Sequence, residues 1–223
     1  MRRPYLLAAA AWAVAAVLLT GCGPDDDRSA PDARPSAVGE LGAGFIGAAS
    51  PAPESTVTPR PGSWSGVRPS AGYRVVLLTA GSDRPTRTLV EAVEKWAEDE
   101  DVDLRTVRAS GADDLLPAAT RALRARADLV ISAGDDLVDP LATVTPNHLD
   151  QRFLVVGAEL AEPTENVTAV DWTGASFRGE GLGAASTYDA ASFTADRCAA
   201  AVRAGTAAVL SGRTGIVVWL DEF

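Results

Sequence analysis

The sequence is poor in the residue types that most often carry chemistry. Its 223 residues include two cysteines and one histidine, and only 6% are aromatic. A single histidine without clustered cysteines cannot build a His/Cys zinc site, so no metal is expected. Acidic residues outnumber basic ones by 30 to 20, which gives a net charge of −10 and leaves no basic stripe for a nucleic acid. The composition therefore predicts neither a metal or other cofactor nor a nucleic-acid partner.

The sequence also lacks the usual signs of a hydrolytic active site. No Gly-x-Ser-x-Gly segment occurs, and the lone His148 has no evident nucleophile to activate. His148 follows Pro146 and Asn147, which places it on a surface turn. We therefore expect a protein that is not an enzyme.

The N-terminus has the pattern of an export signal. Arg2 and Arg3 precede an apolar run from Tyr5 to Leu19, and small residues follow before Cys22. The run is about 15 residues long, short of the roughly 20 that span a bilayer comfortably. The sequence thus predicts a signal peptide over residues 1–21.

The end of this signal, Leu19-Thr20-Gly21-Cys22, resembles the bacterial lipobox. The resemblance implies cleavage before Cys22 and attachment of diacylglycerol to its thiol, with palmitate-like acyl chains that anchor the protein. We expect a lipid-anchored protein on the outer, extracytoplasmic face of the cell membrane. An uncleaved anchor helix and an ordinary secretory signal are the alternatives.

Composition divides the remaining chain into two parts. Residues 22–71 are dense in Pro, Gly, Ser and Ala and open with three aspartates, so they are predicted to form a flexible tether behind the lipidated cysteine. Residues 72–223 are predicted to form one folded α/β lobe. Since Cys22 is committed to lipid, Cys198 has no partner for an internal disulfide and is expected as a buried thiol.

Short apolar runs alternate with helical patterns through the second part. Strands are predicted at residues 73–79, 102–107, 128–132, 153–156, 167–172 and 216–220. Helices are predicted after Asp83, near Leu115 to Leu123, near Leu137 to Val144, and from Ala191 to Leu210. This alternation is typical of βαβ units, so the fold class is α/β: a single Rossmann-like (flavodoxin-like) lobe with a mostly parallel sheet and helices on both faces.

In such sheets ligands bind at the carboxyl ends of the strands, near a topological switch point. The candidate ligand residues are therefore those at predicted strand ends: Thr79, Ser82, Asp83, Gly134, Asp135 and Trp172. Carboxylates there could accept hydrogen bonds from sugar hydroxyls or pair with a cation.

Each candidate also has a structural interpretation. Acidic residues favour the first turn of a helix, and capping is the favoured role of Asp135 and the adjacent Asp136. A tryptophan at a strand end such as Trp172 more often packs in the core than stacks on a ligand.

Several ordered segments of the lobe resemble the basic membrane protein family of substrate-binding lipoproteins, which serve ABC importers. These segments are Thr79-Ala80-Gly81-Ser82-Asp83, residues 127–134, Phe153 to Gly157, Asn166 to Trp172, and Arg203 to Leu210 leading into Thr214 to Val217. The resemblance covers the first lobe of the family's type I periplasmic-binding-protein-like fold. It implies recognition of a small solute that is delivered to an ABC permease.

The sequence departs from that family in ways that bear on the ligand. The family's aromatic and amide residues after the first strand have no counterpart in residues 83–87, and Asp135 replaces an aromatic residue common in the family. A purine nucleoside is therefore a doubtful ligand. A homodimer or a separate second-lobe partner could rebuild the cleft that two-lobed members have.

The expected function is non-catalytic recognition of a small solute by a membrane-anchored lobe linked to ABC-type import. The alternative is an interaction or scaffold lipoprotein that has lost its ligand. The last strand, Ile216 to Leu220, is apolar, so we expect it either to join the sheet edge or to meet a second polypeptide.

Overall fold

The computed structural model describes residues 37–47, 51–175 and 188–223. All of these described residues belong to one compact unit. Its strands are β1 (Thr56–Val57), β2 (Arg74–Thr79), β3 (Asp103–Arg108), β4 (Leu129–Ala133), β5 (Phe153–Val156), β6 (Val167–Asp171) and β7 (Val217–Trp219). Its α-helices are α1 (Arg84–Asp99), α2 (Leu115–Arg124), α3 (Val138–Val144) and α4 (Ala195–Leu210), with short 3₁₀ turns η1 (Ala112–Asp114), η2 (Asp135–Leu137), η3 (Thr145–Asn147) and η4 (Ala190–Ser192).

The strands form one sheet in the order β1-β7-β6-β5-β4-β2-β3. Every strand pair in it is parallel, from β2 beside β3 and β4 to β7 beside β1. Strands β4, β5 and β6 are buried along their whole length, as strands covered on both faces should be. The predicted α/β lobe with a parallel sheet is confirmed.

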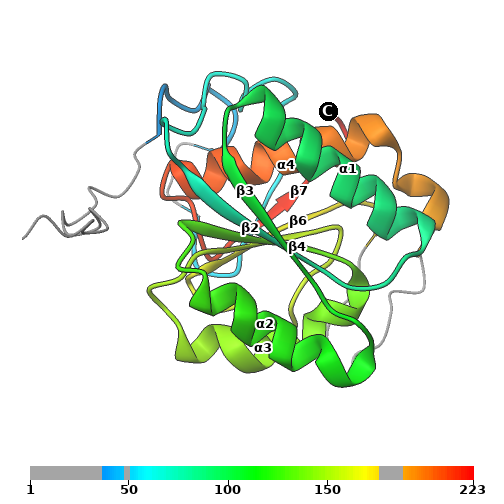
Figure 1. Cartoon of the computed structure of the whole chain (residues 1–223). Helices are drawn as coiled ribbons and strands as arrows, with labels where there is room; N and C mark the ends of the chain where they lie inside the picture. The colour runs from blue at the N-terminus through cyan, green and yellow to red at the C-terminus, as the bar shows by residue number, and fades with distance from the viewer. Residues whose placement is uncertain (1–36, 48–50, 176–187) are drawn as a thin grey trace, which may run out of the picture. The chain divides into compact units, whose positions relative to one another are not determined.

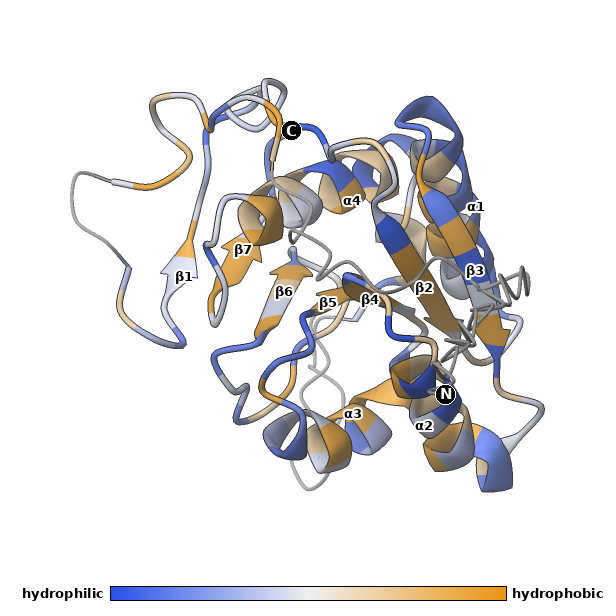
Figure 2. Ribbon diagram, turned by 60° about the vertical axis from the view of Figure 1, so that its left-hand side comes forward, coloured by the Kyte–Doolittle hydropathy of each residue, from blue (hydrophilic) through white to orange (hydrophobic). Residues whose placement is uncertain are grey.

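Helices cover both faces of the sheet (Figure 1). One apolar cluster joins the sheet to α1 and α4, and includes Val75, Leu77, Trp96 and Val202. The other joins it to α2 and α3, and includes Val76, Leu78 and Leu141. Successive residues of β2 alternate between the two clusters because strand side chains alternate between faces. Figure 2 shows β7 mostly in the hydrophobic colours, whereas the edge strand β3, on the other side of the sheet, alternates between hydrophobic and hydrophilic residues.

The segment before Tyr73 differs from its prediction. Composition predicts a flexible tether through residue 71, but over residues 37–47 and 51–71 the chain packs on the lobe. Phe45 and Trp64 are 1% and 6% exposed and join the cluster of α1 and α4. Low overall hydrophobicity suggests a tether, yet a few large apolar side chains are enough to fix the segment. The predicted boundary at residue 72 therefore lies too late in the chain, and residues 22–36 lie outside the described part.

The last strand joins the sheet, which is the first of its two expected placements. Strand β7 pairs with β6 through Ala169 to Asp171, and β1 occupies its other side with Thr56 opposite Val217. The strand that covers this edge thus comes from the supposed tether. A second polypeptide is not needed to cover β7.

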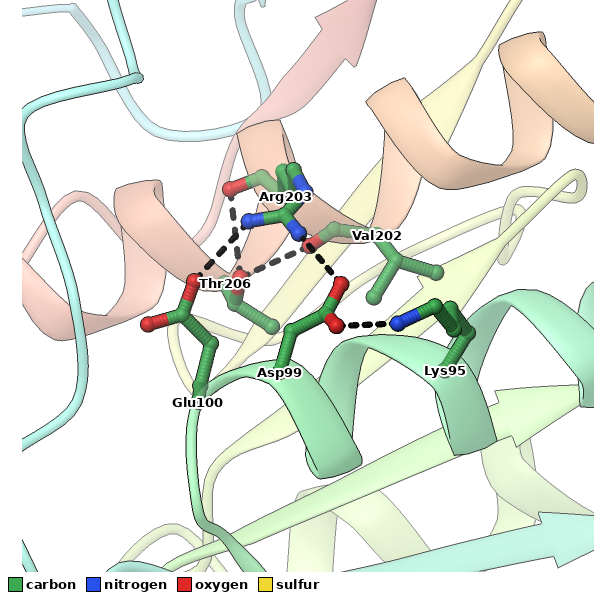
Figure 3. A network of polar contacts seen from close by, with 6 residues as sticks. All are labelled: Lys95, Asp99, Glu100, Val202, Arg203 and Thr206. Carbon is green, nitrogen blue, oxygen red and sulfur yellow. Dashed lines mark hydrogen bonds and ion pairs between the residues drawn. The ribbon is translucent and has the colours of Figure 1, made fainter.

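Polar contacts join the two helices on one face (Figure 3). The Arg203 guanidinium of α4 donates to Glu100 Oε1 at 2.9 Å and to Asp99 Oδ2 at 3.1 Å, at the end of α1. Lys95 pairs with the same Asp99 from the preceding helical turn. Thr206 is turned inward and donates to the Val202 carbonyl at 2.7 Å. The Arg203 side chain is 42% exposed, so this network orients the helices more than it stabilises them.

Two further expectations from the sequence concern single residues. Cys198 is fully buried in α4 as a free thiol, and burial raises its pKa to about 12, which makes it inert. His148 lies on an exposed turn, as expected. None of the helices in the described ranges combines the length and the apolar character needed to cross a bilayer.

Candidate binding site at the carboxyl edge of the sheet

The order of the strands creates a switch point between β2 and β4. Strand β2 pairs with β3 on one side and β4 on the other, so the chain leaves β2 toward one edge and later continues from β4 toward the opposite edge. The helices that follow these two strands, α1 and α3, lie on opposite faces of the sheet, and in open parallel sheets the crevice beyond the carboxyl ends at such a point is the usual position of a ligand. Four of the six predicted ligand residues, Ser82, Asp83, Gly134 and Asp135, belong to the turns after β2 and β4.

Two glycines let these turns approach one another. Gly134 has a φ of +119°, and a Cβ there would lie 2.5 Å from the carbonyl oxygen of Ala80. Gly81 has a φ of +81°, and its Cβ would lie 3.2 Å from Asp83 Oδ2 and 3.7 Å from Asp136 Oδ2. Only glycine fits the first position without moving the backbone. Gly134 therefore acts by allowing close approach of the two turns, and offers a ligand only its backbone.

Asp83 caps helix α1, which agrees with the general preference for acidic residues at helix starts. Its Oδ1 accepts from the Thr86 backbone N–H at 2.9 Å and its Oδ2 from the Thr86 hydroxyl at 2.7 Å. Burial by itself would raise the pKa of Asp83, but the two Thr86 hydrogen bonds and nearby Arg87 bring it below its ordinary value. Asp83 is therefore a fixed, ionised carboxylate at the mouth of the crevice.

Asp135 and Asp136 open the 3₁₀ turn after β4. Both lie in the first turn, where the sequence favours acidic residues because of the exposed N–H groups and the dipole, and neither carboxylate accepts a hydrogen bond from another described residue, which leaves their oxygens available. Burial, together with the charges of Asp83 and Asp136, raises the pKa of Asp135 to about 6. Burial and the carboxylates of Asp135, Asp83 and Asp189 also raise the pKa of Tyr188. These carboxylates and the phenol thus share one electrostatic environment.

A cavity of about 390 Å³ opens beside these groups. It lies between the turns after β2 and β3 and the start of α2, and it is lined by Gly81, Ser82, Arg108, Ser110 and Asp136, with apolar residues between them. Arg108 reaches toward the Gly81 carbonyl at 3.5 Å. The volume is in the range of pockets that hold small ligands.

The other two predicted residues lie deeper. Thr79 is fully buried at the end of β2, and its hydroxyl has no hydrogen-bond partner among the described residues. Trp172 is fully buried too: its indole N–H donates to Ser192 Oγ at 2.9 Å, and its ring meets Phe193 edge-on with centroids 5.0 Å apart. Trp172 thus packs in the core, as the structural interpretation from the sequence favours, and does not line the cavity.

Two buried carboxylates at neighbouring strand ends were missed by the sequence interpretation. Glu159 follows β5 and is 5% exposed, and Asp171 ends β6 and is fully buried. Asp171 Oδ1 accepts from the Trp172 backbone N–H at 2.9 Å. The sequence did contain a signal for them: an acidic residue lies at or shortly after the end of each of four adjacent strands, β2, β4, β5 and β6. Within the described ranges no group of three or more His, Cys, Asp or Glu side chains is placed to hold a metal ion.

Comparison with known proteins gives only distant likenesses. The sequence matches no protein-family model and no curated protein. An ABC transporter solute-binding protein from Aeropyrum pernix K1 is 20% identical with a TM-score of 0.41, over 45% of this chain and 29% of that one. Another, from Bradyrhizobium sp. BTAi1 with bound bis-tris, is 12% identical with a TM-score of 0.36, over 84% of this chain and 60% of that one. A transcriptional activator of the comK gene from Bacillus halodurans is 16% identical with a TM-score of 0.39, over 45% of this chain and 35% of that one.

These neighbours have different functions, and their TM-scores all lie below 0.5. They assign neither a family nor a ligand to this chain. The chain spans less than a third of the length of the Aeropyrum protein. Membership of the basic membrane protein family stays a prediction from the sequence.

Proposed function

We propose that this chain is a membrane-anchored lipoprotein whose α/β lobe binds a small, polar solute at the carboxyl edge of its sheet without chemical conversion. The ligand class is a solute rich in hydrogen-bond donors, either hydroxyl groups or an ammonium group. The observation that carries the proposal is the convergence of Asp83, Asp135 and Asp136 at the switch point, beside a cavity of about 390 Å³.

The chemistry of the lining supports a donor-rich solute. Ionised carboxylates are acceptors only, and the carboxylates of Asp135 and Asp136 accept no hydrogen bond from the other described residues. The hydroxyls of Ser82 and Ser110 add groups that accept or donate. When a ligand without matching donors enters such a site, the polar groups of the site stay unpaired, and this free-energy penalty favours the donor-rich ligand over it.

The link to membrane transport rests on the N-terminal sequence and on the family resemblance. The lipobox-like ending at Cys22 would anchor the lobe on the outer face of the membrane, where a solute-binding lobe would deliver its ligand to an ABC permease. Replacing Cys22 by Ser tests the anchor: we expect the protein to move from the membrane fraction to the soluble exported fraction and to lose radiolabelled palmitate.

The binding proposal is tested by a thermal-shift screen of Ala33–Phe223 against amines, amino acids, sugars and nucleosides. A hit is then titrated into the wild type, Asp135→Asn, and the matched control Asp103→Asn, which removes an exposed carboxylate at the start of edge strand β3. We expect Asp135→Asn to weaken binding by about ten- to a hundredfold, since hydrogen bonds to a charged group contribute about 1.5–3 kcal/mol. The control should bind like the wild type.

Two results would count against the proposal. Equal affinity in Asp135→Asn and the wild type would move the site away from the crevice. A well-folded lobe that responds to no class in the panel would favour the alternative of an interaction or scaffold lipoprotein, which a pull-down with the intact anchored protein would then address.

A further inference from the structure

A second cavity lies at the opposite, amino-terminal edge of the sheet. It has a volume of about 520 Å³ and is enclosed by the end of α2, the turn before β4, the end of α3 and the loop before β5. Leu123 and Val144 give it an apolar floor, and Arg124, Arg126, His148 and Asp150 stand around it. The residues of the carboxyl-edge crevice do not take part in it.

Among the residues that the structure describes, the two arginines of this cavity, Arg124 and Arg126, have no acidic partner. Several arginines of the lobe are paired with carboxylates, as Arg121 is with Asp114 and Arg203 with Asp99. Arg124 and Arg126 make no ion pair or side-chain hydrogen bond within the described residues. The protein has a net charge of −10, so acidic residues that could pair with these guanidiniums are plentiful in the sequence.

The backbone at Arg126 has a conformation that disfavours most side chains. Helix α2 ends at Arg124, Ala125 caps it, and Arg126 follows with a φ of +52°. That left-handed position after a helix end normally favours glycine, because a side chain there is strained. The arginine therefore costs stability where it stands, and its side chain lines the cavity.

We propose that this cavity binds a phosphate-bearing small molecule. The guanidiniums of Arg124 and Arg126 hold the phosphate, and the less polar part of the ligand lies over Leu123 and Val144. A planar guanidinium pairs with two phosphate oxygens at once, which favours this ligand class. Asp150 is the one carboxylate of the lining, and two guanidiniums outweigh it.

Arg126→Gly separates binding from folding. Glycine relieves the left-handed strain, so the variant should unfold at the same or a higher temperature than the wild type while losing affinity. The test follows backbone amide NMR signals of Ala33–Phe223 during titration with inorganic pyrophosphate at low salt. We expect saturable shifts around Arg126 and His148, with affinity reduced about tenfold in Arg126→Gly and in Arg124→Gln. Arg105→Gln, which removes an exposed arginine from β3, is the matched control and should bind normally.

A second arm distinguishes a free phosphate compound from a lipid headgroup. Phosphatidylglycerol vesicles are compared with phosphatidylcholine vesicles in a sedimentation assay with the same variants. Arginine-dependent binding of the anionic vesicles without binding of pyrophosphate assigns the phosphate to a lipid headgroup and supports the proposal. Absence of arginine-dependent binding in both arms, or pyrophosphate shifts that persist in Arg126→Gly, overturns it.

Discussion

Phe45 provides the sharpest test of the folded N-terminal segment. The side chain is 1% exposed and packs in the cluster shared by α1 and α4, although sequence composition placed it in a tether. Phe45→Ala removes the ring and leaves a cavity in that cluster. If the segment folds together with the sheet, the whole lobe must lose stability.

The size of the effect follows from core substitutions in general. Phe-to-Ala changes in packed cores cost about 3–5 kcal/mol. Domains of ordinary stability unfold with a free energy of about 5–15 kcal/mol, so the variant would lose a large share of it. For a lobe of this size each kcal/mol lowers Tm by about 2–4 °C, which predicts a fall of roughly 6–20 °C.

The assay is urea unfolding of Ala33–Phe223, followed by tryptophan fluorescence and by far-UV circular dichroism. Trp64 lies in the same segment and is 6% exposed, so fluorescence contains a local signal, whereas dichroism reports the helices. Val38→Ala is the matched control, because Val38 is 45% exposed and is held through its backbone to Arg68. Its cost should stay within about 0.5 kcal/mol.

If Phe45→Ala lowers the free energy of unfolding by less than about 1 kcal/mol, the segment is not part of the folded lobe. The same conclusion follows if the fluorescence transition occurs at a lower urea concentration than the dichroism transition. A chain that begins at residue 72 provides the complementary test. It loses Phe45, Trp64 and strand β1, so it should aggregate or unfold near room temperature.

Three further predictions concern the carboxyl edge and the helices. The pKa of Asp135 is raised to about 6 from 3.8, so the folded lobe holds this proton more tightly than the unfolded chain, and the ionisation of Asp135 lowers stability as pH rises from about 4 to about 6. Asp135→Asn should therefore raise Tm at pH 7 by roughly 2–4 °C and have no such effect below pH 4. Calorimetry across this pH range measures both values. Gly134→Ala should lower the free energy of unfolding by more than about 2 kcal/mol in denaturant, because the new Cβ would clash with the Ala80 carbonyl. Gly212→Ala is the control: Gly212 has a φ of +69° but no atom near the position of a Cβ, so this change should cost only about 1 kcal/mol. Equal costs would show that only the backbone angle matters. Arg203→Gln should lower the free energy of unfolding by no more than about 1 kcal/mol, although Arg203 makes two ion pairs, because these pairs are exposed to solvent. The difference, measured by denaturant unfolding, should become smaller still in high salt.

Local sequence patterns were sufficient for most of the secondary structure. The apolar runs of β2, β4, β5, β6 and β7 are short, rich in branched residues and bounded by turn residues, so each was located within a residue or two. The amphipathic stripe of α1 was equally clear. Strand β1 could not be found this way, because two residues carry no periodicity and its pairing partner lies far along the chain.

The candidate site was predictable only in position. Parallel strands bring their carboxyl ends to one edge, so the strand pattern is enough to place Ser82, Asp83 and Asp135 together. The raised pKa of Asp135 could not be predicted, because it depends on burial and on the charges of Asp83 and Asp136 nearby. The different surroundings of Asp83, whose carboxylate accepts two hydrogen bonds from Thr86, and Asp135, whose carboxylate accepts none from the other described residues, also follow from local geometry that composition does not encode.

By itself the sequence determined the fold class and the edge of the sheet at which the candidate residues gather, while the export signal before Cys22 stays a prediction on residues outside the described part. These follow from periodicity and composition, which act over a few neighbouring residues. The tertiary structure alone decided that Phe45 and Trp64 are core residues, that β1 covers β7, and that Arg124 and Arg126 meet at a cavity. Each of these depends on contacts between parts of the chain that folding brings together, and no local pattern in a single sequence records such contacts.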